Sequence, residues 1–114
     1  MTFLINIAEL PLRGDTARVF EGSQYGDTNV SFFLLDAPPG EGPSLHSHPY
    51  EEIFVIQAGQ AIFTVGDATF EATAGQIVIG PAGFPHKFIN SGKAPLRGIN
   101  IHPISRMITE WLED

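Results

Sequence analysis

The chain consists of short apolar runs separated by Gly, Pro and Asp along its whole length. Short runs with frequent turn residues are typical of β-sandwiches and β-barrels. Hairpin turns are predicted at Gly59 and at Gly66-Asp67, where the chain needs a tight reversal or a positive φ. Strands are predicted at Ala17–Glu21, Asn29–Ala37, Ser44–His48, Glu52–Gln57, Gln60–Val65, Ala68–Ala72, Gln76–Ile79, His86–Asn90 and Leu96–His102.

The predicted strand Glu52–Gln57 is apolar on both faces. Alternation places Phe54 and Ile56 on one face, and Ile53 and Val55 on the other. A strand with one solvated face carries polar residues on that face. We therefore expect the second face to be covered by another sheet or by a second subunit, and we predict a homodimer.

The C-terminal segment Ser105–Glu113 shows helical spacing of its apolar residues rather than alternation. Ser105 is a suitable N-cap, so one short helix is predicted here. The residues that would share one side of this helix are Met107, Ile108, Trp111 and Leu112.

The composition agrees with one all-β domain. The chain has 114 residues, a common single-domain size, so a single domain over residues 1–114 is predicted. Twelve Gly, nine Pro and nine Phe favour many turns and an aromatic interior. Because no cysteine is present, disulfides are excluded.

The charge limits the partners. Thirteen acidic and six basic residues give a net charge of -7, which disfavours binding to nucleic acid or to an anionic membrane. No apolar run approaches the roughly 18 residues of a membrane span. The N-terminal sequence lacks the basic region of a signal peptide. A cytoplasmic location follows as the default expectation.

Candidate chemistry centres on the run H-S-H-P-Y-E-E. His46 and His48 project from one face of a strand, with Cα atoms roughly 6.6 Å apart, so both rings can reach one ion. Glu52 would lie roughly 13 Å further along a straight strand. The chain must therefore bend at Pro49 if Glu52 is to join them. Glu51 has the opposite parity and should point away.

His86 begins the run His86–Asn90 after a turn, and by parity it faces the barrel interior together with Phe88 and Asn90. Three imidazoles and one carboxylate suit one divalent Fe, Mn, Ni, Co or Zn ion. An octahedral ion would keep about two positions for water or substrate. The competing interpretation is a metal-free barrel with buried, hydrogen-bonded polar groups.

The spacing of these residues resembles the two motifs of a small single-domain cupin. The first motif, over residues 40–59, comprises Gly40, His46, His48, Glu52 and Gly59. The second motif, over residues 75–90, comprises Gly75, Pro81, Gly83, His86 and Asn90. Every gap within both motifs matches the family pattern.

This resemblance implies a double-stranded β-helix, or jelly-roll, barrel that holds a metal at its centre and is often dimeric. It also implies four metal ligands, which are His46, His48, Glu52 and His86. The reaction stays open, because cupins include dioxygenases, decarboxylases, isomerases and non-catalytic modules, and a fold does not fix a function.

His102 is the one histidine outside the motifs. It either lines the pocket as a proton shuttle or lies at the rim before Pro103. With Glu52, it is our candidate catalytic residue. Candidate pocket-lining residues are Tyr50, Phe54, Phe88 and Asn90. Of these, Tyr50 either guards the metal or caps the barrel, and Asn90 either touches substrate or satisfies local backbone.

The preferred hypothesis is a metal-dependent enzyme, dioxygenase-like, that acts on a small oxygen-bearing organic molecule. The alternatives are a non-catalytic metal- and ligand-binding module, and an isomerase, epimerase or decarboxylase. By parity Lys87 lies opposite His86 and Arg97 lies opposite His102, so no cation is predicted in the pocket. A neutral, partly apolar substrate is therefore expected.

Overall fold

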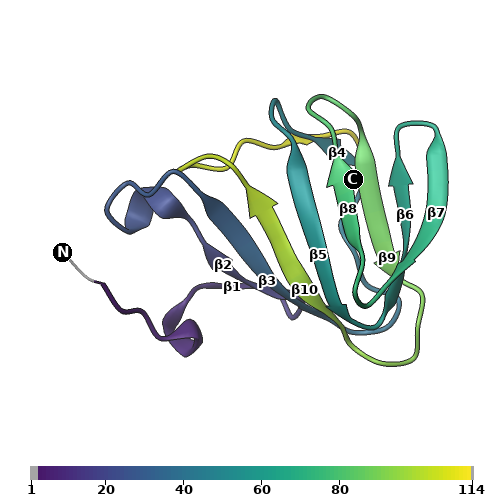
Figure 1. The fold of residues 1–114 in the computed structure, drawn as a ribbon, viewed down its shortest axis with the longest axis horizontal. Coiled ribbons are helices and arrows are strands. Elements are labelled where there is room, and N and C mark those ends of the chain that lie inside the picture. Colours follow the sequence, from purple (N-terminus) through teal and green to yellow (C-terminus); the bar gives the residue numbers. More distant parts are fainter. Residues whose placement is uncertain (1–2, 114) are drawn as a thin grey trace.

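The computed structural model describes residues 3–113, which form two antiparallel β-sheets packed face to face (Figure 1). The all-β prediction is confirmed. The six-stranded sheet contains, in spatial order, β1 (Leu12–Arg13), β2 (Ala17–Phe20), β3 (Ser31–Ala37), β10 (Leu96–His102), β5 (Glu52–Ala58) and β8 (Ile77–Gly80). The five-stranded sheet contains β11 (Glu110–Trp111), β4 (His46–Ser47), β9 (His86–Asn90), β6 (Gln60–Val65) and β7 (Ala68–Thr73). Two single 3-10 turns, η1 (Ile7–Glu9) and η2 (Gly22–Gln24), lie near the N-terminus.

The predicted hairpin turns are present where the sequence places them. Gly59 joins β5 to β6 with φ of 90°, and Gly66 begins the turn from β6 to β7 with φ of 57°. Only glycine adopts such values without strain. At Gly59 a Cβ would also lie 2.8 Å from the carbonyl oxygen of Pro95, so the backbones approach too closely for a side chain.

The predicted C-terminal helix over Ser105–Glu113 is wrong. In its place, the tail runs beside β4 and forms β11, with Trp111 opposite His46. The amide of Leu112 donates to the carbonyl of Leu45 over 2.9 Å. Without the tail, β4 would be an edge strand, and its free backbone groups attract the tail more strongly than local helix formation does.

Aromatic rings fill the space between the sheets. Phe54 lies edge-on to Phe63 and to Phe88, with centroids 5.1 Å and 5.8 Å apart. All three side chains are at most 5% exposed. Phe54 also meets the ring of His86 edge-on at 5.6 Å. The core therefore packs directly against a histidine of the candidate site and limits its movement.

The outer face of the six-stranded sheet is apolar, as the two-sided pattern of β5 predicts. Strand register places apolar side chains from β8, β5 and β10 in two rows, one of Ile79, Ile53 and Ile101 and one of Ile77, Val55 and Ile99. Ile77 and Ile79 are 64% and 59% exposed. Residues 3–113 contain no helix with the length and hydrophobicity needed to cross a membrane.

Candidate metal centre

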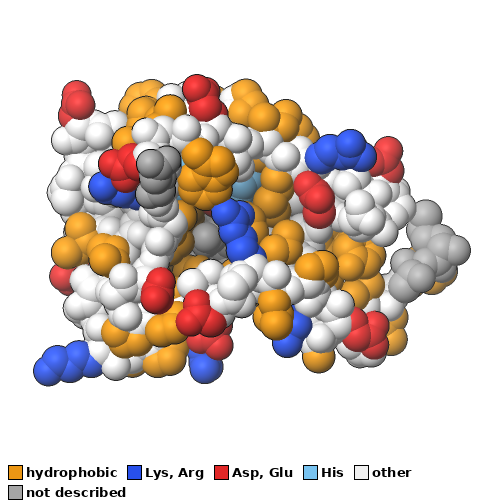
Figure 2. Space-filling view, turned by 180° about the vertical axis from the view of Figure 1, so that it is seen from behind, with side chains coloured by type: hydrophobic (Ala, Val, Ile, Leu, Met, Phe, Trp, Pro, Cys, Tyr) orange, Lys and Arg blue, Asp and Glu red, His pale blue; other side chains and the backbone are white. Residues whose placement is uncertain are grey.

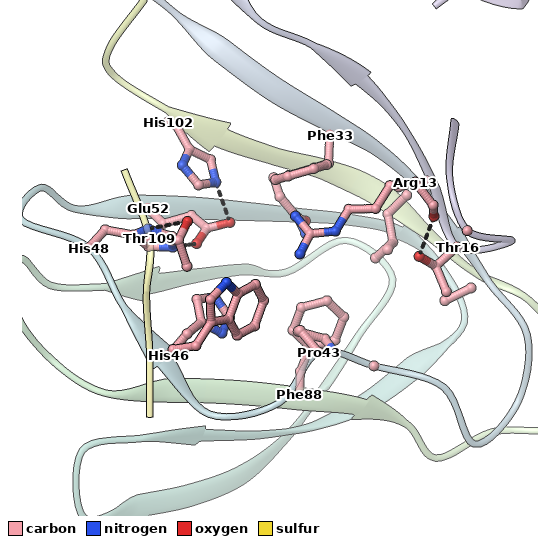
Figure 3. A pocket seen from close by; sticks show the side chains of 17 residues that line it. Arg13, Thr16, Phe33, Pro43, His46, His48, Glu52, Phe88, His102 and Thr109 are labelled. Atoms are coloured by element: carbon pink, nitrogen blue, oxygen red, sulfur yellow. Dashed lines mark hydrogen bonds and ion pairs between the residues drawn. The ribbon is translucent and has the colours of Figure 1, made fainter. Parts of the chain in front are cut away.

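Three strands bring the four predicted ligands together. His46 and His48 lie on and just after β4, Glu52 begins β5, and His86 begins β9, directly opposite His46. The chain reverses between His48 and Glu52 at Pro49, as the spacing requires. One ligand atom from each of the four residues lies within 4.8 Å of all the others; Figure 3 shows three of them, His46, His48 and Glu52. All four side chains are between 1% and 6% exposed.

Backbone carbonyls fix the orientation of the three imidazoles. Nδ1 of His46 lies 2.7 Å from the carbonyl of Ser44, and Nδ1 of His48 lies 2.7 Å from that of Ile108. Nδ1 of His86 lies 3.1 Å from the carbonyl of Phe84. A carbonyl only accepts, so each Nδ1 carries the proton. Each ring therefore turns Nε2 toward the centre, which is the arrangement that a metal requires, although Nε2 of His86 is also within hydrogen-bond reach of Oε1 of Glu52.

The distances around Glu52 fit an ion between the four groups. Oε1 of Glu52 lies 3.0 Å from Nε2 of His48 and 3.1 Å from Nε2 of His86. Neighbouring ligands of an octahedral ion with bonds of about 2.1 Å are about 3.0 Å apart. The contact between Nε2 of His48 and the carboxylate lacks hydrogen-bond alignment, so this buried nitrogen has no hydrogen-bond partner in residues 3–113. The metal-free interpretation leaves it unsatisfied, whereas a divalent ion would bind it.

Electrostatics favour the same assignment. Burial lowers the pKa of His46 to about 4, so its ring is neutral at neutral pH and available as a ligand. Burial alone would raise the pKa of Glu52, and hydrogen bonds from His102, His48 and His86 lower it when their nitrogens carry protons; with His48 and His86 as ligands, a bound cation would hold the carboxyl ionised instead. The pKa of this carboxyl is held well below its usual range, so Glu52 is an anion. A neutral imidazole set with one carboxylate matches a hard or borderline divalent cation.

His102 faces the interior, which settles the orientation that the sequence left open. Its side chain is 1% exposed. Nε2 of His102 lies 3.0 Å from Oε2 of Glu52, whereas His48 and His86 approach the other carboxylate oxygen, Oε1. On the other side of the ring, Nδ1 lies 2.6 Å from the hydroxyl of Tyr50. Burial raises the pKa of the Tyr50 phenol, which keeps it protonated and able to donate to Nδ1. The three side chains thus lie one after another from the carboxylate to the phenol, although the contact between Nε2 of His102 and Glu52 lacks hydrogen-bond alignment, as it does for His48.

Tyr50 is held in turn by the C-terminal tail. The amide of Ile108 donates to the Tyr50 hydroxyl over 3.2 Å, while the carbonyl of Ile108 accepts from Nδ1 of His48. One residue of the tail therefore orients both a candidate ligand and the partner of His102. Sequence reasoning missed this role because it treated the tail as a separate helix.

A cavity of about 280 Å³ is lined by three of the four residues, His46, His48 and Glu52. Phe88 lines it, as predicted, but Tyr50, Phe54 and Asn90 are not among the lining residues. Phe54 belongs to the core behind His86. Asn90 is engaged with backbone, donating to the carbonyls of Ala37 and Ala94, which is the structural alternative given above for this residue.

The expectation that no basic side chain lines the cavity is wrong. Arg13 of β1 lines it, and so do Phe33 and Trp111. The parity argument considered only basic residues on the strands that carry His86 and His102. Arg13 belongs to a two-residue strand that the apolar pattern did not reveal, and its position depends on the pairing of β1 with β2. Because Arg13 lines the cavity, the expectation of a neutral substrate is no longer supported.

Comparison with known proteins agrees with this arrangement. Residues 33–102 match the family model of the cupin domain. A double-stranded β-helix protein from Klebsiella pneumoniae superposes with a TM-score of 0.75 at 20% identity, covering 100% of both chains. An oxalate decarboxylase from Bacillus subtilis with Mn(II) centres superposes with a TM-score of 0.80 at 23% identity, covering 92% of this chain and 30% of the other. The predicted double-stranded β-helix fold is confirmed.

A curated relative shares sequence as well as fold. A dimethylsulfoniopropionate lyase from Ruegeria pomeroyi is 33% identical over 67 residues, which are 58% of this chain and 33% of the lyase. The chain spans 55% and 33% of the lengths of two curated relatives that it matches. The family match and the buried histidine–glutamate cluster together indicate a centre for a divalent metal ion.

Substitution of Tyr50 by Phe tests the chain from Glu52 to Tyr50. The variant leaves Nδ1 of buried His102 without its partner, so we expect the free energy of unfolding to fall by about 1–3 kcal/mol. Tyr25→Phe is the matched control, because Tyr25 stacks on Phe20 and no hydrogen bond of its hydroxyl is found in residues 3–113. Urea unfolding of the metal-free proteins measures both. Equal stability of the two variants would contradict the proposed hydrogen bond.

Proposed function

This chain belongs to the cupin domain family, and from that premise we propose that it is a metal-dependent enzyme acting on a small oxygen-bearing organic molecule. The proposed ligands of its single metal ion are His46, His48, Glu52 and His86. The observation that carries the proposal is the convergence of imidazole Nε2 lone pairs and one carboxylate beneath a cavity of about 280 Å³. Such a cavity suits a small ligand.

The roles of the residues follow from their positions. A bound divalent ion supplies Lewis-acid or redox chemistry to an oxygen atom of the ligand. Glu52 contributes Oε1 to the ion and keeps Oε2 beside Nε2 of His102. His102 lies between the two groups, with Nε2 3.0 Å from Oε2 of Glu52 and Nδ1 2.6 Å from the Tyr50 hydroxyl, so it is placed to relay a proton between them. The apolar walls at Phe33 and Phe88 exclude water and strengthen these polar contacts.

The preferred reaction class is an oxidation by dioxygen. Four protein ligands leave about two positions of an octahedral ion for substrate and a second small molecule. The second class is proton transfer in a lyase or isomerase, and two observations favour it. His102 lies inside the barrel with a proton-bearing partner, Tyr50. A partial relative is named as a lyase.

Metal content tests the centre itself. Protein made without added metal, then loaded and dialysed, should hold about one divalent ion per chain by elemental analysis. His86→Ala removes one ligand, so its metal affinity should fall by more than the roughly 10–100-fold that loss of an outer partner costs. Lys87→Ala, on the same strand and facing outward, should keep the ion. Full retention by His86→Ala would show that the ligand is misplaced.

Oxygen uptake separates the two reaction classes. The iron-loaded protein is assayed with phenolic and diketone substrates, and dioxygen consumption coupled to substrate loss is the result expected for the preferred class. Bound iron without dioxygen consumption would exclude the preferred class.

Proton exchange at carbon, followed by NMR in deuterated water, tests the second class, proton transfer. There, His102→Ala should lower the rate by about 10²–10⁴-fold, as loss of a general acid or base does.

A second copy of the chain is the proposed partner of the apolar outer face of the six-stranded sheet. Light scattering should give the mass of two chains, because exposed apolar rows of this extent favour a self-complementary interface. Ile79→Glu, on the edge strand β8 of that face, should shift the mass to one chain. Ile62→Glu, on the outer face of the other sheet and 40% exposed, should leave the dimer intact. A wild-type mass of one chain would refute the proposal.

A further inference from the structure

Arg13 is a cation at the mouth of the cavity that the proposed chemistry does not use. Its guanidinium points from β1 toward the histidines and Glu52 (Figure 3). Within residues 3–113 it forms no ion pair, and its only interactions beyond the backbone are with two aromatic rings. In the space-filling view, a basic side chain borders the hollow in which a histidine is visible (Figure 2).

Two rings hold the guanidinium in place. Its central carbon lies 5.2 Å from the ring centroid of Phe33 and 5.3 Å from that of Trp111. Trp111 lies against His46 with centroids 4.9 Å apart, and Phe33 lies edge-on to His102 at 5.5 Å. Only one ring therefore separates Arg13 from a proposed metal ligand on one side and from the acid–base histidine on the other.

The backbone of Arg13 is also fixed. Arg13 pairs with Ala17 of β2, and both the amide and the hydroxyl of Thr16 donate to its carbonyl, over 3.3 Å and 3.1 Å. A side chain that starts from a paired strand and lies between two rings is oriented before a ligand arrives, so little conformational entropy is lost on binding. The five N–H groups of the guanidinium keep their donor capacity for that ligand.

The charges along the cavity are complementary to an organic acid. Within residues 3–113, the ionisable side chains that line the cavity are those of Arg13, His102 and three proposed ligands, His46, His48 and Glu52, and most of the remaining wall is apolar. Because the whole chain carries a net charge of -7, an anion enters only where a local cation attracts it. A planar guanidinium matches the two oxygens of a carboxylate. A volume of about 280 Å³ limits the ligand to a small molecule.

We propose that Arg13 binds the carboxylate of a small organic acid whose remaining atoms extend between Phe33 and Phe88 toward the metal centre. Arg13 is thus the residue that selects acids over neutral compounds of the same shape. The orientation of the far end of the ligand rests on the proposed function, whereas the contact with Arg13 does not. The proposal replaces the neutral substrate expected from the sequence.

The test compares acids with their amides, which share shape but lack the charge. Linear acids from acetate to hexanoate and the matching amides are titrated into the wild-type protein, both metal-free and loaded with redox-inert zinc. Trp111, the single tryptophan, lines the cavity and reports binding by its fluorescence. Calorimetry provides an independent affinity. We expect acids to bind about tenfold or more tightly than their amides, as a charge-assisted hydrogen bond allows.

Variants assign the preference to one residue. Arg13→Gln should bind acids about tenfold more weakly and lose the preference for them, with its metal content unchanged. Arg13→Lys keeps the charge without the planar fork and should fall between. Arg97→Gln is the control, because it removes the same charge from an exposed position that pairs with Asp36 outside the cavity. It should bind acids as the wild type does.

Three results would overturn the proposal. They are equal binding of acids and amides by the wild type, an absence of acid binding in every form, and an acid preference that survives in Arg13→Gln. The wild-type ratio needs no variant, so it stands even if Arg13→Gln fails to fold. A protein that binds no metal yet prefers acids through Arg13 would refute the proposed function alone. A protein that binds metal but shows no preference would refute the role of Arg13 alone.

Discussion

The candidate site depends on the protonation of Nδ1 in three histidines. Each Nδ1 lies within hydrogen-bond distance of a backbone carbonyl, so each Nε2 is left with a lone pair that points at the same small volume. Two of these nitrogens lie about as far from one carboxylate oxygen as two neighbouring ligands of an octahedral ion do. Without a cation, lone pairs would face an anion in a buried space, which is costly. The segments next to the strands, which supply the carbonyls of Ser44, Phe84 and Ile108, therefore determine the chemistry of the centre.

The C-terminal tail contributes more to the site than its length suggests. Ile108 offers its carbonyl to His48 and its amide to Tyr50, and Trp111 packs on His46. The same segment places one of the two rings that hold Arg13. Metal ligation, proton transfer and ligand selection, as proposed here, thus share one short stretch of backbone. A change in the tail is therefore expected to affect all three.

The sequence predicted the barrel strands and the grouping of the four proposed ligands, and the reasons are physical. Alternation fixes which residues of a strand face inward, and the separation of His48 from Glu52 requires a bend that Pro49 permits. The tail was predicted wrongly because its apolar residues have helical spacing, and local spacing carries no information about a free strand edge elsewhere. Arg13 was missed for a related reason. Its strand has two residues, and only pairing with β2 directs its side chain into the cavity.

The pairing of β11 with β4 has a consequence for solubility. The backbone of β4 bears two proposed metal ligands and would form the edge of its sheet if the tail moved away. An uncovered edge offers unpaired N–H and C=O groups to any other chain, and adding strands at such an edge is a common route to aggregation. The cover is a strand of two residues, Glu110–Trp111, which the hydrogen bonds of Ile108 and Leu112 hold in place. The wall of the binding cavity is therefore also the barrier that keeps neighbouring molecules from joining this sheet.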